Sequence, residues 1–138
     1  MDLIEQLKRH EGFRSKPYLC TAGKLTIGYG RNLDDIGITK AEAEQLLTND
    51  VRVATQELLR AYPFIDGLKP ARFDCLVNKF FNLGISRLSK FNKMWAAIEE
   101  GSYRKASEEM LDSKWARQVG VRAEELAYQM LTGEYYGS

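Results

Sequence analysis

Hydrophobic positions follow a helical spacing over most of the chain. Leu3, Ile4 and Leu7 recur at intervals of three and four residues, so they predict a first helix over about residues 2–11, which Gly12 would end. The same spacing predicts three later helices near residues 89–100, 103–112 and 120–132. The chain is therefore expected to be mostly α-helical.

Two local signals mark the starts of longer helices. Thr39-Lys40-Ala41-Glu42 is a capping box, in which the Thr hydroxyl and the Glu carboxylate each satisfy a free backbone N–H. It opens a long helix that runs through Leu59 before Pro63 interrupts it. Lys69-Pro70 then starts the most apolar helix, with proline in the tolerated first turn. This helix is expected to form the core with Phe73, Leu76, Val77, Phe80 and Phe81.

One stretch breaks the helical pattern, between Pro17 and Tyr29. Strand-forming residues stand on both sides of Ala22-Gly23-Lys24, and this pattern predicts a β-hairpin. Gly28 and Gly30 would allow bends or a close approach of the backbone. It is the one segment for which the sequence predicts β structure.

Together these elements predict an α+β fold that is mostly α-helical. We expect a single domain over residues 1–138, in which a long helix joins a small β-hairpin lobe to a larger helical lobe. The hairpin lobe would cover about residues 12–60, and the helical lobe about residues 61–138 together with the N-terminal helix, residues 1–11. A cleft between the lobes would be the natural ligand site.

Charge and hydropathy narrow the classes of function. The 20 Lys and Arg residues nearly balance the 19 Asp and Glu residues, so the net charge of +1 does not indicate a nucleic-acid binder. No apolar stretch is long enough to span a bilayer, and the first ten residues resemble an amphipathic helix more than a signal peptide. We therefore expect folding in a cytoplasm, without membrane insertion.

Cysteine and histidine usage narrows the chemistry. Cys20 and Cys75 are too few for a disulfide scaffold and have no metal-ligand spacing. Cys75 is expected to be a buried small hydrophobe, although a Cys20–Cys75 bridge stays open at this point. With His10 as the single histidine, Ser-His-Asp triads and multi-histidine metal sites are disfavoured. We expect no metal and no cofactor.

The strongest candidate for chemistry is Glu11, where the first helix meets the hairpin. Eight residues separate it from Cys20, and five more separate Cys20 from Thr26. A carboxyl group partly withdrawn from water beside a cleft could donate a proton to a leaving oxygen.

At this point the sequence resembles a known family. Glu11-Gly12-Phe13-Arg14, Pro17-Tyr18, Cys20, Gly23 and Leu25-Thr26-Ile27-Gly28-Tyr29-Gly30 are similar to the N-terminus of the T-even phage lysozymes, glycoside hydrolase family 24. Those endolysins show Glu, eight residues, Asp or Cys, five residues, Thr. Residues 78–84 and 114–122 resemble the family's central-helix and C-terminal motifs. The likeness runs in order from residue 3 to about residue 133.

The resemblance implies a role for each matching residue. Glu11 would protonate the oxygen that links N-acetylmuramic acid to N-acetylglucosamine. Cys20 and Thr26 would orient the water that attacks the opposite face of the sugar, giving inversion. Arg122 matches the arginine that pairs with the catalytic Glu. Phe81 and Asn82 match cleft-lining positions, and the alternatives are core packing for Phe81 and a helix-end polar residue for Asn82.

The resemblance also implies a biological setting. The chain would be a lysozyme that degrades bacterial peptidoglycan for host-cell lysis, as a monomer without a nucleic-acid partner. It would stay in the host cytoplasm until a separate holin-type protein gave it access to the periplasm and cell wall.

Three residues depart from the family pattern. Cys20 replaces the more familiar aspartate, and because an ordinary thiol with a pKa of about 8.5 is a poor base at pH 7, it would mainly position water. Arg31 stands where a relative has histidine, and could pair with an acid in the larger lobe. Lys79 interrupts the most apolar helix. It would either extend its stem to the surface, or be buried, neutral or paired, and destabilising.

Two other functions stay open at the level of sequence. A lytic transglycosylase cleaves the same bond with one acid and leaves an anhydro sugar. A non-catalytic peptidoglycan-binding module, or a structural phage protein with this fold, would be indifferent to Glu11→Gln.

Overall fold

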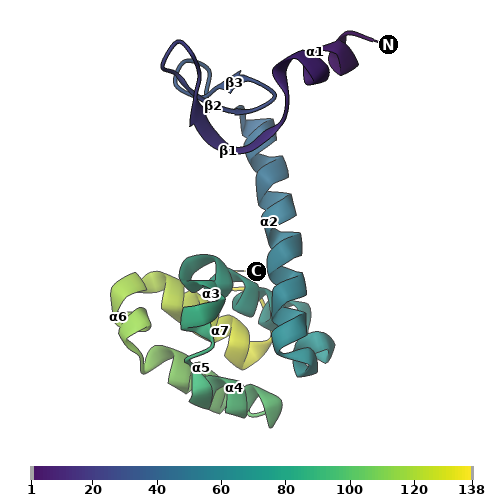
Figure 1. Ribbon diagram of the computed structural model, residues 1–138. Coiled ribbons are helices and arrows are strands. Elements are labelled where there is room, and N and C mark those ends of the chain that lie inside the picture. Colours follow the sequence, from purple (N-terminus) through teal and green to yellow (C-terminus); the bar gives the residue numbers. More distant parts are fainter. Residues whose placement is uncertain (1, 138) are drawn as a thin grey trace. The chain divides into compact units, whose positions relative to one another are not determined.

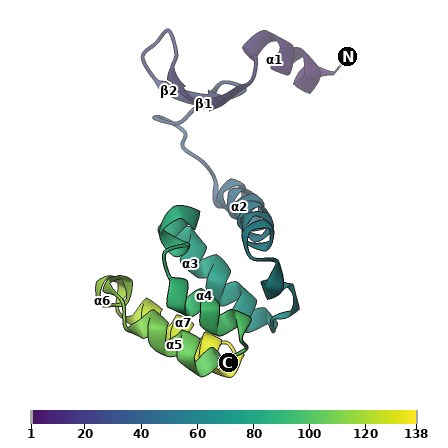
Figure 2. The ribbon, with the colours of Figure 1, turned by 60° about the horizontal axis from the view of Figure 1, so that its bottom comes forward.

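The structure is a computed structural model that describes residues 2–137 (Figures 1 and 2). It is mostly helical, with one small three-stranded antiparallel sheet, which confirms the predicted α+β class. The chain divides into two compact units, Met1–Thr48 and Asn49–Ser138, which are described separately below. The predicted single domain, with lobes that meet near residue 60 and a cleft between them, stays a prediction.

The first unit begins with helix α1, Leu3–Glu11. The Asp2 side chain caps it by accepting a hydrogen bond from the backbone N–H of Glu5 at 2.8 Å. Gly12 ends the helix as predicted, since its φ of 71° is open to glycine, and its N–H donates to the Lys8 carbonyl. This abrupt end places Glu11 on the last helical turn, directly before the sheet.

The sheet of the first unit has the order β1-β2-β3, with β1 at Arg14–Leu19, β2 at Leu25–Gly28 and β3 at Arg31–Asn32. Strands β1 and β2 form the predicted hairpin, in which Tyr18 lies opposite Thr26. The turn closes through a bond from the Gly23 N–H to the Cys20 carbonyl. The sequence does not predict strand β3, because an alternation of polar and apolar residues cannot be recognised over only two residues.

Helix α2, Lys40–Ala61, begins in the first unit and continues into the second. The predicted capping box is present. The Thr39 N–H donates to Glu42 Oε1 at 2.8 Å, and the Glu42 N–H donates to Thr39 Oγ1 at 3.1 Å.

The second unit is helical. After the 3₁₀ turn Pro63–Gly67 come α3 at Pro70–Leu88, α4 at Asn92–Glu99, α5 at Tyr103–Leu111, α6 at Lys114–Val119 and α7 at Val121–Thr132. Helix α5 packs against α4 and α7, and α3 packs against α7, as both views show (Figures 1 and 2). Helix α6 was not predicted, since six residues show too little periodicity.

The hydrophobic core of the second unit is built around α3. Leu58, Leu76, Leu88 and Met110 have no exposed surface, and Cys75 is buried as predicted. Both cysteines are free, so the Cys20–Cys75 bridge is not formed. Among the expected core residues of α3, Phe73 and Phe80 pack against this core, but Phe81 is 41% exposed.

Lys79 lies inside this core, so its stem does not extend to the surface. Its side chain is fully buried, and Nζ has no hydrogen-bond partner among the described residues. Nζ lies 3.6 Å from the centroid of the Phe91 ring and 3.9 Å from that of the Trp115 ring. Burial lowers the pKa of Lys79 to about 7, while the two ring faces favour its charged form.

Residues 2–137 hold neither a membrane-spanning helix nor a metal-binding cluster. None of these helices is long and apolar enough to cross a membrane. In the same part of the chain, no group of three or more His, Cys, Asp or Glu residues could hold a metal ion.

Candidate active site

Glu11 is exposed at the end of α1, and its carboxylate lies against Gly30. A Cβ atom added to Gly30 would come within 3.0 Å of Glu11 Oε2 and 3.4 Å of its Cδ. The φ of Gly30 is also +86°, a conformation that side chains rarely adopt. Gly30 therefore allows the close backbone approach that the sequence indicated, and the group that it admits is the candidate acid.

Cys20 and Thr26 lie together on the hairpin. Cys20 directly follows β1 and is partly exposed, whereas Thr26 in β2 is only 4% exposed. The Thr26 hydroxyl donates to the Lys24 carbonyl at 2.9 Å and is also within hydrogen-bond reach of the Cys20 thiol. The two side chains therefore form one polar pair beside the turn.

The environment of Cys20 favours a thiolate. Backbone hydrogen bonds from Lys24 and Ala22 lower the pKa of Cys20. The sequence predicts an ordinary thiol at this position, because hydrogen bonds from turn amides cannot be read from residue types. A larger share of Cys20 is thus in the thiolate form, which can accept a proton, than in a free cysteine.

The opposite face of β2 borders an apolar hollow. Successive strand residues point to opposite faces, so Ile27 turns away from the side that Thr26 occupies. Ile27 lines a hollow of about 560 Å³ together with Leu33, Ile38 and Leu46. Glu11, Cys20 and Thr26 do not line this hollow, so the polar pair and the apolar hollow are separate features.

Arg31 pairs with Glu42 beside this hollow. Nη1 and Nη2 of Arg31 donate to the two carboxylate oxygens at 2.8 and 2.5 Å, and Nη1 also donates to the Gly37 carbonyl. The expectation that Arg31 pairs with an acid in the larger lobe was wrong, because the start of α2 brings Glu42 to the end of the sheet. Hydrogen bonds from Arg31 lower the pKa of Glu42 to about 2.

The other predicted residues lie in the second unit. Phe81 lines a hollow of about 380 Å³ with Val53, Ala54 and Phe80, among others. Asn82 is exposed, and its Oδ1 accepts a hydrogen bond from Trp115 Nε1 at 2.7 Å. The exposure of Phe81 removes the alternative of core packing for this residue.

Arg122 is held by Asn78. Its Nε donates to Asn78 Oδ1 at 2.9 Å, and its Nη2 donates to the Asn78 backbone carbonyl at 3.2 Å. Sequence reasoning did not single out Asn78 or Trp115. The four-residue interval between Asn78 and Asn82 would have indicated that both lie on one face of α3.

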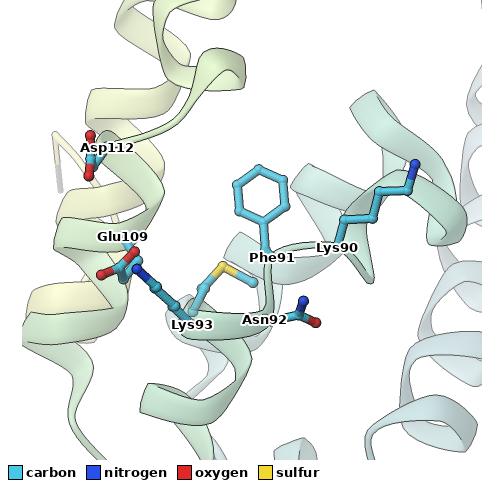
Figure 3. Close-up of a pocket in the computed structure, with 7 residues that line it drawn as sticks. Lys90, Phe91, Asn92, Lys93, Glu109 and Asp112 are labelled. Atoms are coloured by element: carbon cyan, nitrogen blue, oxygen red, sulfur yellow. The ribbon is translucent and has the colours of Figure 1, made fainter.

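Another hollow, of about 360 Å³, lies between α4 and α5 (Figure 3). It is lined by Lys90, Phe91, Asn92, Lys93, Met94, Glu109 and Asp112. None of the predicted site residues lines it. One of its lining residues is Phe91, whose ring contacts Lys79 Nζ.

The sequence of this chain is also similar to the sequences of known proteins. The family model for phage lysozyme matches residues 8–129. The chain belongs to the phage lysozyme family. This confirms the predicted resemblance and places the chain among the lysozyme-type glycoside hydrolases.

Three relatives illustrate the range of the phage lysozyme family. An endolysin of Acyrthosiphon pisum secondary endosymbiont phage 1 is 32% identical over 80% of this chain and 75% of its own length. A probable T4-type lysozyme of Dictyostelium discoideum is 28% identical over 95% of this chain and 94% of its own. The pre-baseplate central spike protein of Enterobacteria phage T4 is 29% identical over 99% of this chain. The chain spans only 29% of the length of that spike protein.

Proposed function

We propose that this chain hydrolyses the β-1,4 bond between N-acetylmuramic acid and N-acetylglucosamine in bacterial peptidoglycan, with Glu11 as the catalytic acid. The observation that carries the proposal is the position of the Glu11 carboxylate, which lies against Gly30 and is open to a ligand. A carboxyl group with one face against glycine backbone can approach a sugar oxygen without interference from a neighbouring side chain.

The first step transfers a proton from Glu11 to the glycosidic oxygen, so that the bond to the anomeric carbon breaks and the electron pair leaves with that oxygen. A water held by Cys20 and Thr26 adds its hydroxyl group to the anomeric carbon from the opposite face. The water's remaining proton passes to the Cys20 thiolate. The configuration is inverted, and both carboxyl and thiol return to their starting state by exchange with solvent.

The hydrogen bonds of the hairpin support this division of roles. Because the Thr26 hydroxyl hydrogen is directed to the Lys24 carbonyl, its oxygen lone pairs are free to accept from the water. The lowered pKa of Cys20 provides an acceptor for the second proton of that water. Thr26 therefore orients the nucleophile, and Cys20 accepts its proton.

Three further roles are carried over from the family resemblance. Arg122 supports the catalytic Glu, and Phe81 and Asn82 bind substrate. The exposure of Phe81 and Asn82 supports this, since both are free to touch a ligand. The single domain with a cleft between two lobes belongs to the same proposal.

The biological role that we propose is host-cell lysis, with the protein acting as a monomer. Similarity to an endolysin supports this role. Access to the periplasm and cell wall would come from a separate holin-type protein. Expression in a Gram-negative host should leave the culture intact until the inner membrane is permeabilised, and should then clear it; clearing without permeabilisation would contradict the access step.

The catalytic proposal is tested by mass analysis of soluble fragments released from purified Gram-negative peptidoglycan. The unmutated protein should release fragments with reducing muramic-acid ends, and Glu11→Gln should release none. Glu5→Gln is the matched control, because it makes the same change on the same exposed helix and should retain full activity.

Two other outcomes would replace the proposal. Anhydro-muramic ends would identify a lytic transglycosylase, since no water would then have reached the anomeric carbon. Release of no fragments by the unmutated protein would favour a peptidoglycan-binding module or a structural phage protein. Equal release by Glu11→Gln would show that another group is the acid.

A further inference from the structure

The apolar hollow of the first unit lies between one face of the sheet and one face of α2. Ile27 of β2 is paired with Arg31 of β3, and because directly opposite residues on neighbouring strands point to the same side, both side chains leave the sheet on one face. Glu42 and Leu46 are four residues apart on α2, so they share one face of that helix. All four side chains line the hollow, which is therefore formed where the two faces meet.

A network of polar contacts at one edge fixes the spacing of these two faces. Nη1 and Nη2 of Arg31 donate to the two carboxylate oxygens of Glu42 at 2.8 and 2.5 Å, and Nη1 also donates to the Gly37 carbonyl at 3.0 Å. The capping box with Thr39 holds the same carboxylate at the start of α2. Because its walls are tied together by these contacts, the hollow is formed in advance, and a ligand does not have to order it.

The lining of the hollow is aliphatic and is not packed into a core. Its apolar surface comes from four aliphatic side chains, Ile27, Leu33, Ile38 and Leu46. None of them is buried, and Ile38 and Leu46 are 49% and 52% exposed. Within residues 2–48 the one buried side chain is Thr26, so no hydrophobic core of this unit fills the space. Replacement of water by hydrocarbon on this surface is favourable.

Two further features of the lining define the class of ligand. The charged lining residues, Arg31 and Glu42, neutralise each other, so the hollow offers no net charge to an ionic group. The ring in the lining is that of Tyr29, which already contacts the Phe13 ring, with centroids 5.6 Å apart, and Lys8 Nζ at 5.8 Å. The hollow therefore suits an uncharged aliphatic group better than an ion or a stacked aromatic ring.

We propose that the apolar hollow binds one hydrocarbon chain of an uncharged ligand, whose polar end remains in solvent. The hollow has a volume of about 560 Å³, which lies within the range of roughly 300–1,000 Å³ that is usual for small-molecule sites. Glu11, Cys20 and Thr26 do not line it, so this is a second site, separate from the candidate active site. The inference does not rest on the proposed function.

The test is an NMR titration of full-length protein that carries ¹³C-labelled Ile and Leu methyl groups. The probe is tetraethylene glycol monooctyl ether, an octyl chain on an uncharged head, added below its micelle concentration. Methyl signals of the four aliphatic lining residues should shift and saturate. Those of Leu3 and Leu19, which are 65% and 69% exposed but do not line the hollow, should stay in place. Tetraethylene glycol, which has the same head without the chain, should shift none of them.

Two neighbouring leucines of α2 provide a matched pair of variants. Leu46→Asn removes an apolar lining side chain, so the affinity for the octyl probe should fall about fivefold or more. Leu47→Asn makes the same change at the next residue, which is equally exposed at 53% but does not line the hollow. It should bind the probe as well as the unmutated protein. An equal loss in both variants would overturn the assignment of the site to the hollow.

A third variant tests the preference for uncharged ligands. Glu42→Gln leaves the Arg31 guanidinium without its charge partner, so octanoate should gain affinity relative to the uncharged octyl probe. No relative gain would show that the Arg31–Glu42 pair does not determine this preference, and would overturn that part of the proposal.

Other results would replace the proposed ligand. Shifts with toluene at lower concentration than with the octyl probe would identify a site for aromatic ligands. Lining methyl signals that change with protein concentration, without any probe, would show that a second copy of the chain covers the hollow. If the lining methyl signals do not move at saturating probe, or if Leu3 and Leu19 shift to the same extent, no specific site for a hydrocarbon chain exists there.

Discussion

The two units of this protein are stabilised by different means. Within residues 2–48 the one buried side chain is Thr26, whereas the buried hydrophobic residues lie between Ala54 and Met130. The first unit depends on a helix cap, hairpin hydrogen bonds, a capping box and the Arg31–Glu42 pair. The second depends on a core in which even a lysine is enclosed. The candidate acid Glu11 lies in the first unit and is exposed, so water and ligand can reach it.

The sharpest contrast between the units is the reactivity of their cysteines. Cys20 is partly exposed with a lowered pKa, whereas burial raises the pKa of Cys75 to about 12. At pH 8 the thiolate fractions should differ by about a thousandfold or more. Iodoacetamide should therefore label Cys20 alone, as read by peptide mass mapping, and labelling should abolish cleavage. Equal labelling of both thiols would show that the second unit opens easily.

A core truncation should cost far more in the second unit than in the first. Leu76→Ala removes a fully buried side chain and should lower the free energy of unfolding by about 2–5 kcal/mol. Leu46→Ala, at a position that is 52% exposed, should cost less than about 1 kcal/mol. Denaturant unfolding followed by fluorescence suits this comparison, because Trp95 and Trp115 both report on the second unit. A large effect of Leu46→Ala would mean that the units unfold together.

Removing the buried charge should stabilise the second unit. The pKa of Lys79 falls from about 10.5 to about 7, a shift that corresponds to about 5 kcal/mol. Lys79→Met removes this cost and should therefore raise the free energy of unfolding at pH 7 by a few kcal/mol, at most about 5 kcal/mol. Lys93→Met, on an exposed position of α4, is the control and should change little.

Lys79→Met should also change how the free energy of unfolding depends on pH. Between pH 7 and about 10.5 the unfolded chain binds a proton at Lys79 that the folded chain does not, so stability should rise with pH over this window. Lys79→Met should lack that rise. A parallel pH dependence in both proteins would show that Lys79 is not the titrating group.

The smallest effect is expected for the ion pair of the first unit. Both partners are more than a third exposed, so Arg31→Met should lower the local stability only slightly, as measured by hydrogen exchange in residues 25–42. Because the pKa of Glu42 is lowered to about 2, the contribution should be present above pH 4.5 and fade as the pH falls towards 2. Glu42→Gln retains a capping box and completes a double-mutant cycle. If the cycle shows no coupling between Arg31 and Glu42, the hairpin hydrogen bonds, and not this ion pair, stabilise the first unit.

Local signals in the sequence predicted much of the fold. Gly12 ended α1, Thr39 and Glu42 capped α2, and Pro70 began α3, since each depends on residues only a few positions apart. Strand β3 and helix α6 were missed because two and six residues are too short to show a period. The Phe81 assignment to the core was wrong, because periodicity identifies an apolar position without showing whether another element covers it.

The sequence by itself determined the class of fold, the family and the candidate acid, because cap residues, turn glycines and motif spacing act over short distances along the chain. Tertiary structure alone decided which groups meet. It placed Lys79 Nζ against the rings of Phe91 and Trp115, and it paired Arg31 with Glu42. It also directed the side-chain oxygen of Asn82 to the N–H of the buried Trp115 indole. Burial and hydrogen bonding depend on residues far apart in sequence, and so do the charges and donors that a ligand would meet.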